Sequence, residues 1–235
     1  MSLTSRAPTL LYAHGFASGP RSAKGAALAR HEAARGLEVR LLDLRVPERE
    51  KLRLSSMVEA IRRAVPEGGR ALGVGSSLGG LAMARAAEQD ARLVGLVLLA
   101  PAFRLVERWR ERMGADAWER WVRAGTWPYD DYALGGTFDL DFGFIEDATQ
   151  VDGELASALG GADGLDPRWP DVRVPTVILH GAHDETVAIS LSRAFAERRP
   201  NVRLVELDDD HRLAKPTSLE AMLREVDAMS SRLSE

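Results

Sequence analysis

The sequence predicts an α/β fold, a mostly parallel sheet of about six strands with helices on both faces. Apolar runs of strand length alternate with segments of helix length, which is typical of a parallel sheet because each crossover between parallel strands needs a helix. Turn residues bound these segments: Gly19-Pro20 precedes the first expected helix and Gly36 follows it. The expected strands are residues 9–13, 39–44, 70–74, 93–100, 174–180 and 202–207. The expected helices are residues 22–35, 56–65, 81–88, 189–199 and 218–233.

Length and composition predict one domain, residues 1–235, because the chain is long enough for one large core and short for two. A formal net charge of −4 argues against a nucleic-acid partner, since such proteins concentrate positive charge. The absence of cysteine excludes disulfides, thiolate catalysis and Cys-ligated metals. The apolar run at residues 10–13 is too short to be a signal or a membrane span, so we expect a cytoplasmic protein with no membrane partner. The sequence leaves the oligomeric state open.

One interval interrupts the alternation and is expected to be a small cap inserted in the domain. Residues 103–169 hold all five tryptophans, two of the three tyrosines and four of the six phenylalanines. Trp118, Trp121 and Val122 have helical spacing, and residues 138–144 alternate like a strand. Glycines within 160–164 are expected to form the linker back to the sheet. Tryptophans at helical spacing can equally form core or line a pocket.

The segment 75–79, GSSLG, has the form G-x-S-x-G and lies between a predicted strand and a predicted helix. This order predicts a nucleophile elbow, in which Ser77 occupies a strained turn between the two elements. Glycines on either side let strand and helix approach without an intervening β-carbon. Ser76 is expected to be a hydrogen-bonding neighbour, since it would point back along the strand.

An acid and a histidine follow the serine in the order that this kind of elbow requires. Asp184 comes just after a predicted strand, at the carboxyl end of the sheet where open α/β folds bind ligands, and is the candidate orienting acid. Glu185 and Asp210 are its possible substitutes. His211, in a loop after the last strand, is the candidate base. The other four histidines are less suitably placed for this role. His14 precedes the serine, His31 lies in a predicted helix, His180 ends a predicted strand and His183 adjoins the acid.

The loop after the first strand is expected to complete the site. In elbows of this type one oxyanion N–H comes from that loop and one from the residue after the nucleophile. These are the backbone groups of Phe16 and Leu78. His14, just before the loop, is interpreted as a structural residue that ties the loop down.

Three binding interpretations fit the residues less well. A dinucleotide fingerprint starting at Gly73 would need its third glycine at position 78, which is leucine. Metal binding by His180, His183 and Asp184 lacks a further nitrogen donor of helical H-x-x-x-H spacing. The acidic run 208–210 lacks the spaced ligands and glycine of a calcium loop. We therefore expect no metal and no organic cofactor.

With these residues placed, the chain resembles the serine α/β-hydrolase superfamily over nearly its full length. Its opening is similar to that of small bacterial esterases, and it also resembles the mitochondrial acyl-protein thioesterase and acyl-glucuronide deacylase branch. The stretches that carry the resemblance are Leu11 to Gly19 with Ser22-Ala23-Lys24, Gly75 to Gly80, and His180-Gly181-x-x-Asp184. The chain departs from the pattern in Ala182-His183 and in the Asp-rich approach to His211. The resemblance implies an α/β-hydrolase fold that lacks the first two, often antiparallel, strands.

These residues together predict a serine hydrolase that cleaves a carboxylic ester or thioester of a small to medium apolar acyl group through an acyl-enzyme on Ser77. The expected partner is a small-molecule ester or thioester. The same three residues could instead serve C–C, peracid or peptide chemistry, because the catalytic groups are shared. A hydrolase-like protein that only binds a small ligand is the remaining alternative, although a pure binder needs no complete triad.

Overall fold

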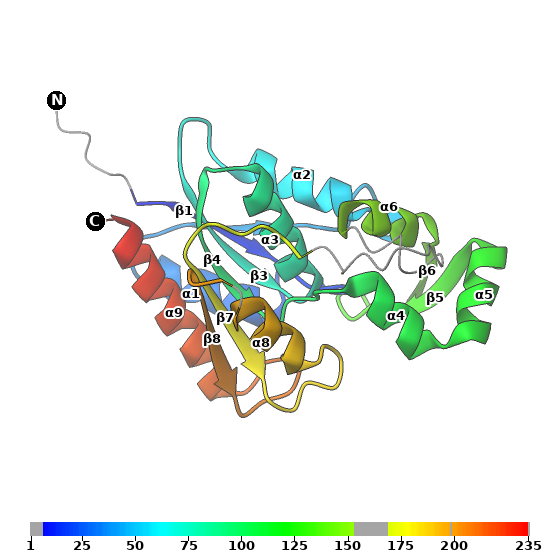
Figure 1. The fold of residues 1–235 in the computed structure, drawn as a ribbon. Coiled ribbons are helices and arrows are strands. Elements are labelled where there is room, and N and C mark those ends of the chain that lie inside the picture. The colour runs from blue at the N-terminus through cyan, green and yellow to red at the C-terminus, as the bar shows by residue number, and fades with distance from the viewer. Residues whose placement is uncertain (1–6, 153–168, 198, 235) are drawn as a thin grey trace.

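The computed structural model describes residues 7–152, 169–197 and 199–234. A six-stranded sheet with all neighbours parallel forms its centre (Figure 1). The strand order is β2 (Val39–Leu42), β1 (Thr9–Ala13), β3 (Ala71–Ser76), β4 (Leu93–Leu99), β7 (Thr176–Gly181) and β8 (Val202–Leu207). The prediction of a mostly parallel six-stranded α/β sheet is therefore confirmed.

Helices cover both faces of this sheet because successive strand residues point to opposite sides. Leu11 and Leu98 belong to a core on one face, together with buried residues of α2 and α3. Tyr12 and Leu99 belong to a second core on the other face, together with α1 and α9. The helices are α1 (Ala23–Ala33), α2 (Leu54–Ala64), α3 (Leu78–Gln89), α8 (Ile189–Glu197) and α9 (Pro216–Ser234), with a 3₁₀ turn η1 (Arg49–Lys51) before α2.

The segment after β4 forms a separate group of elements at one end of the sheet (Figure 1). It contains α4 (Leu105–Met113), α5 (Ala115–Ala124), the antiparallel hairpin β5 (Thr126–Asp130) and β6 (Thr137–Asp141), and α6 (Gly143–Asp152). Arg49 Nη1 donates to Asp131 at 2.9 Å and Arg53 Nη1 to Asp141 at 2.7 Å. These two ion pairs fasten the hairpin to the chain around η1.

The helical spacing of Trp118, Trp121 and Val122 is confirmed, because all three lie in α5. The strand-like alternation over residues 138–144 is wrong beyond position 141. The strand ends at Asp141, and Phe144 lies in α6, where its fully buried ring belongs to the main core. An apolar residue at every second position therefore marks a strand only as far as Leu140. The predicted glycine linker at 160–164 lies outside the described residues.

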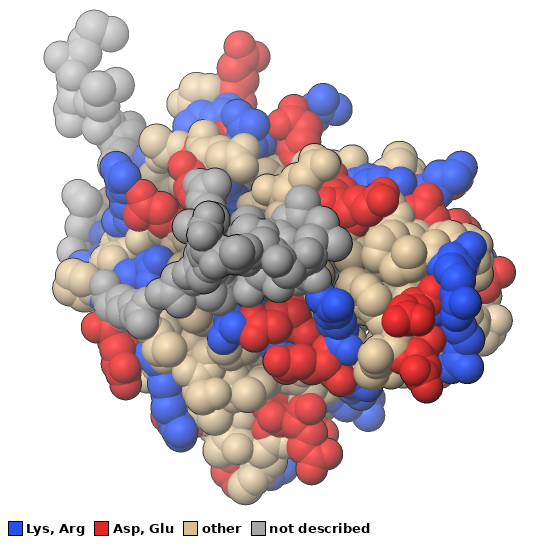
Figure 2. Space-filling view, turned by 45° about the vertical axis from the view of Figure 1, so that its right-hand side comes forward, with Lys and Arg blue, Asp and Glu red and all other residues tan. Residues whose placement is uncertain are grey.

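None of the helices in the described ranges is long and apolar enough to cross a lipid bilayer. On the face shown in Figure 2, acidic and basic side chains lie interspersed rather than gathered into a patch of one sign.

Candidate active site

Ser77 occupies a strained turn between β3 and α3, with φ 52° and ψ −116°. Its backbone is held on both sides: its N–H donates to the carbonyl of Leu99 at 2.8 Å, and its own carbonyl accepts from the N–H of Ala102 at 3.0 Å. A positive φ in a non-glycine residue costs free energy and persists only where the surroundings impose it. The strand, the turn and the helix therefore hold the serine in a sharp strand-to-helix turn, which is the backbone geometry that a nucleophile elbow requires.

The glycines of the motif make this close packing possible. A β-carbon on Gly75 would lie 2.6 Å from the carbonyl oxygen of Gly79. A β-carbon on Gly79 would lie 2.4 Å from the carbonyl oxygens of both Ala13 and His14. The end of β1 therefore lies directly against the first turn of α3, which brings the loop after β1 next to the serine.

His211 and Asp184 lie in line with Ser77. The Ser77 hydroxyl lies 3.0 Å from His211 Nε2, and His211 Nδ1 lies 2.7 Å from Asp184 Oδ2. An N–H on Nδ1 donates to the carboxylate, which leaves Nε2 free to accept the hydroxyl proton. The structure thus brings together three residues that are far apart in the sequence. Asp184 follows Ser77 by 107 positions, and His211 follows Asp184 by 27. An imidazole in this position can act as the base that activates the serine.

The carboxylate of Asp184 is fully buried and has a partner for each oxygen. Oδ1 accepts the backbone N–H groups of Thr186 and Val187, both at 2.8 Å. Oδ2 lies 2.7 Å from His211 Nδ1 and 3.0 Å from His180 Nε2. Burial by itself raises the pKa of Asp184, but the hydrogen bonds from His180 and His211 outweigh it and hold that pKa well below its usual range. The carboxylate therefore stays ionised and oriented toward His211.

Neither possible substitute for the acid takes this position. Asp210 accepts the backbone N–H of Arg212 at 2.8 Å, and Glu185 is exposed. Of the candidate acids, Asp184 is the one in contact with His211.

The loop that carries His211 is held from several sides. Asp209 is buried, and its Oδ2 accepts the Ser218 hydroxyl at 2.6 Å and the backbone N–H of Lys215 at 3.0 Å. From α1, Lys24 Nζ donates to the carbonyl of Arg212, the residue after His211. Burial lowers the pKa of Lys24 to about 8, against a smaller opposing effect of nearby Asp209. The Ser22-Ala23-Lys24 stretch therefore contacts the loop that carries His211.

The loop after β1 lies beside the serine. A β-carbon on Gly15 would be 3.3 Å from the Ser77 β-carbon, so Phe16 follows a residue in direct contact with the elbow. Leu78 is the first residue of α3, where backbone N–H groups lack partners within the helix. Within the described ranges neither the Phe16 nor the Leu78 N–H has a hydrogen-bond partner. Both are available to bind an oxyanion.

His14 ties the β1 loop to the segment that follows β2, as expected for a structural residue. It is buried, its Nε2 accepts the backbone N–H of Leu44 at 3.0 Å, and its Nδ1 donates to the carbonyl of Gly15 at 2.9 Å. Burial lowers the pKa of His14, so the neutral ring that this bonding pattern requires is favoured.

Aromatic side chains of the segment after β4 surround the Phe16 ring. The ring centroid of Phe16 lies 5.0 Å from that of Trp109 and 5.1 Å from that of Tyr129, and both contacts are edge-on. Phe138 and Phe144 lie at 6.0 and 6.5 Å. Phe16, which follows the glycine in contact with the elbow, thus packs through its side chain against α4, β5, β6 and α6. Trp121, by contrast, is fully buried core.

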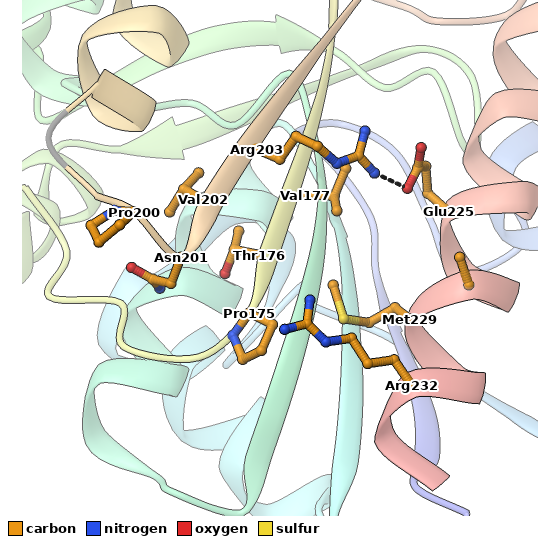
Figure 3. Close-up of a pocket in the computed structure, with 11 residues that line it drawn as sticks. Pro175, Thr176, Val177, Pro200, Asn201, Val202, Arg203, Glu225, Met229 and Arg232 are labelled. Carbon is orange, nitrogen blue, oxygen red and sulfur yellow. Dashed lines mark hydrogen bonds and ion pairs between the residues drawn. The ribbon is translucent and has the colours of Figure 1, made fainter. Parts of the chain in front are cut away.

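A cavity of about 290 Å³ lies elsewhere, between β7, β8 and α9 (Figure 3). Its lining includes Pro175 and Thr176 where β7 begins and Asn201 where β8 begins, and an ion pair between Arg203 and Glu225 crosses one side. It therefore opens at the amino ends of the strands. Ser77 and Asp184 follow the carboxyl ends, so this cavity is separate from the candidate site.

The structure also separates the residues of the rejected metal interpretation. His183 is exposed and contacts Asp208 at 2.9 Å, whereas His180 is buried against Asp184. Among the described residues, a different group could offer three ligand atoms within 4.8 Å of one another, which the first set does not: His31, Glu32 and Asp227. Arg35 already forms ion pairs with both carboxylates of that group. These contacts fasten α1 to α9.

His180 is the contact that sequence reasoning missed. From the sequence it is expected to end a strand, is set aside as a metal ligand and is not expected to contact the acid, which follows four positions later. A histidine that ends a buried strand, followed by glycine and the acid, is the signal that could have indicated it.

The fold is that of the α/β-hydrolases, and within it Ser77, His211 and Asp184 form a hydrogen-bonded line. Alpha/beta hydrolase domain-containing protein 10 from mouse is similar in structure, with a TM-score of 0.74 and 23% sequence identity over 98% of this chain and 92% of that one. Est1E from Butyrivibrio proteoclasticus with ferulic acid bound gives 0.72 and 20% over 98% and 91%. The esterase domain of a Rhodothermus marinus protein gives 0.63 and 19% over 99% and 90%.

The chain belongs to the Uncharacterised protein family (UPF0227), whose family model matches residues 9–226. No curated protein matches the chain.

Proposed function

We propose that this protein is a serine hydrolase that cleaves carboxylic ester or thioester bonds through an acyl-enzyme on Ser77. The observation that carries the proposal is the continuous hydrogen-bonded line from Ser77 Oγ to His211 Nε2, at 3.0 Å, and from His211 Nδ1 to Asp184 Oδ2, at 2.7 Å. Of the three side chains in this line, the serine hydroxyl is the one that becomes a nucleophile when a base removes its proton, and His211 is the neighbour that can do so.

In the first step His211 accepts the Ser77 proton while the serine oxygen attacks the acyl carbon. The negative charge that develops on the carbonyl oxygen is stabilised by the N–H groups of Phe16 and Leu78. His211 then gives its proton to the departing alcohol or thiol, which leaves the acyl group on Ser77. Asp184 stabilises the imidazolium throughout. Water, activated by His211, releases the acid in the second step.

The aromatic side chains of the cap support an apolar acyl or aryl substrate. Phe16, Trp109 and Tyr129 lie within about 5 to 6 Å of one another, measured between ring centroids. Such a cluster beside the oxyanion loop favours apolar groups and excludes water from the reacting atoms. The ferulic acid named with Est1E and the esterase activity named for the Rhodothermus marinus domain agree with this substrate class.

A fluorophosphonate probe and a series of p-nitrophenyl esters test the proposal. We expect the probe to label the protein, Ser77→Ala to abolish both labelling and turnover, and esters of different acyl length to react at different rates. Ser76→Ala is the matched control, because Ser76 is the buried neighbour on β3 and is expected to leave labelling intact. Labelling of Ser77→Ala at the wild-type level would reject the nucleophile. A labelled protein that turns over neither esters nor the corresponding thioesters would reject the substrate class.

A further inference from the structure

His180 is a buried histidine that the proposed mechanism does not use. It lies near the end of β7 with none of its surface exposed. Its Nδ1 lies 2.8 Å from the hydroxyl of Ser192 on α8, which is equally buried. Its Nε2 lies 2.9 Å from the carbonyl of Val187 and 3.0 Å from Asp184 Oδ2. Every polar atom of the ring therefore has a partner, and one partner is the candidate acid.

The partners determine where the ring proton lies. A backbone carbonyl only accepts hydrogen bonds, so Nε2 carries the proton and donates it toward Val187 with Asp184 Oδ2 beside it. Nδ1 is then the acceptor, and the Ser192 hydroxyl donates to it. The hydroxyl thus selects the tautomer that presents an N–H to the acid, in the same way that an orienting group selects the tautomer of a catalytic histidine.

The same contacts close a small ring around the acid. Val187 donates its N–H to Asp184 Oδ1 and accepts from His180 through its carbonyl. The carboxylate is therefore held at both oxygens, with Oδ2 shared between His180 and His211. Loss of the imidazole would leave the Val187 carbonyl, the Ser192 hydroxyl and one side of Oδ2 without these partners in a buried region.

We propose that His180 is a positioning residue for the reaction, which holds Asp184 Oδ2 in line with His211 and is itself oriented by Ser192. This inference rests on the proposed function. A leucine could fill a buried strand end without any polar partner, whereas a buried imidazole is tolerated only when its nitrogens are bonded. Here the bonds lead to the acid. The functional line therefore runs from Ser192 through His180, Asp184 and His211 to Ser77.

Three variants test this role: His180→Leu, which removes the N–H, His180→Gln, whose amide can restore it, and Ser192→Ala, which removes the oxygen that orients the ring. The measurements are kcat and KM for a p-nitrophenyl ester and the melting temperature. We expect His180→Leu to lower kcat by roughly 10- to 100-fold, the range for loss of a residue that orients a catalytic group, with KM changed by less than about twofold. His180→Gln should recover most of the loss. Ser192→Ala should lower kcat in the same direction by a smaller factor.

Wild-type kcat in a folded His180→Leu protein would overturn the inference, as would equal kcat for the Gln and Leu variants. If His180→Leu does not fold, Ser192→Ala decides the question, and wild-type kcat in that variant would then overturn the inference. Failure of the proposed function gives a different result, since turnover would then persist in Ser77→Ala. Loss of activity in Ser77→Ala with full activity in the His180 and Ser192 variants rejects only the positioning role.

Discussion

Replacing Gly79 with alanine should damage catalysis by moving the loop after β1, whose Phe16 N–H is proposed to bind the oxyanion. The added β-carbon would lie 2.4 Å from the carbonyl oxygens of Ala13 and His14, whereas β-carbons essentially never approach other atoms within 3.0 Å. The end of β1 and the first turn of α3 must therefore separate by about 0.6 Å. Both obstructing atoms belong to the backbone of a central strand and its loop, so the strain cannot be relieved by turning a side chain.

This separation has two measurable consequences. Overpacking against fixed backbone costs about 3 kcal/mol, the upper end for such substitutions, which corresponds to a fall in melting temperature of roughly 6 to 12 °C for a domain of this size. The Phe16 and Leu78 N–H groups lie on the two sides that move apart. A displacement of this order should lower kcat by about 10- to 100-fold. Ester hydrolysis measured at 20 °C, with circular dichroism to show that the variant is folded, tests both values.

Gly36→Ala is the matched control. Gly36 has φ 75° with no atom within 4 Å of the added β-carbon, so alanine there meets only backbone strain of about 1–2 kcal/mol. It should lower the melting temperature by a few degrees and leave kcat unchanged. The reasoning is refuted if folded Gly79→Ala retains wild-type kcat, or if Gly36→Ala loses as much activity as Gly79→Ala.

Three further predictions concern Asp184 and the loop that carries His211. Asp184→Asn should lower kcat by about 10⁴-fold, because the amide cannot hold the reactive tautomer of His211. It should also lower the free energy of unfolding at neutral pH, because the ionised carboxylate, whose pKa is held below its usual range, stabilises the folded state there. Steady-state kinetics that show less than a tenfold loss would contradict the role of the acid. Lys24 has a folded-state pKa of about 8, against an ordinary value of 10.5. Between these two pH values the unfolded state binds more protons than the folded state, so this residue increases the free energy of unfolding as the pH rises. Urea unfolding at pH 7 and pH 9.5 should therefore show wild type gaining stability relative to Lys24→Met at the higher pH, and an unchanged difference would count against the pKa. The same variant should lose activity, because Arg212 beside His211 loses its contact with α1.

Much of the fold follows from local pattern. Strands β1 and β8 have the bounds that the apolar runs predict, and the glycine-bounded elbow places Ser77 between a strand and a helix. Short-range sterics and alternation determine these features, so they can be predicted from neighbouring residues. The segment after β4 could be predicted less well from sequence, because α6 begins inside a run that alternates like a strand. Its Phe144 is buried by tertiary contacts, which the local pattern does not show.

The sequence by itself determined the order of serine, acid and histidine and the glycines that permit a tight elbow, because these depend on covalent order and on the space that each residue occupies next to its neighbours. Only the tertiary structure decided which partners meet. It places Asp184, and neither Asp210 nor Glu185, against His211, and it brings His180 to the other side of the same carboxylate. The physical reason is that hydrogen bonds act over about 3 Å in space. Separation along the chain does not show which groups come within that range. The pairing of the strands does, because it brings their carboxyl ends together.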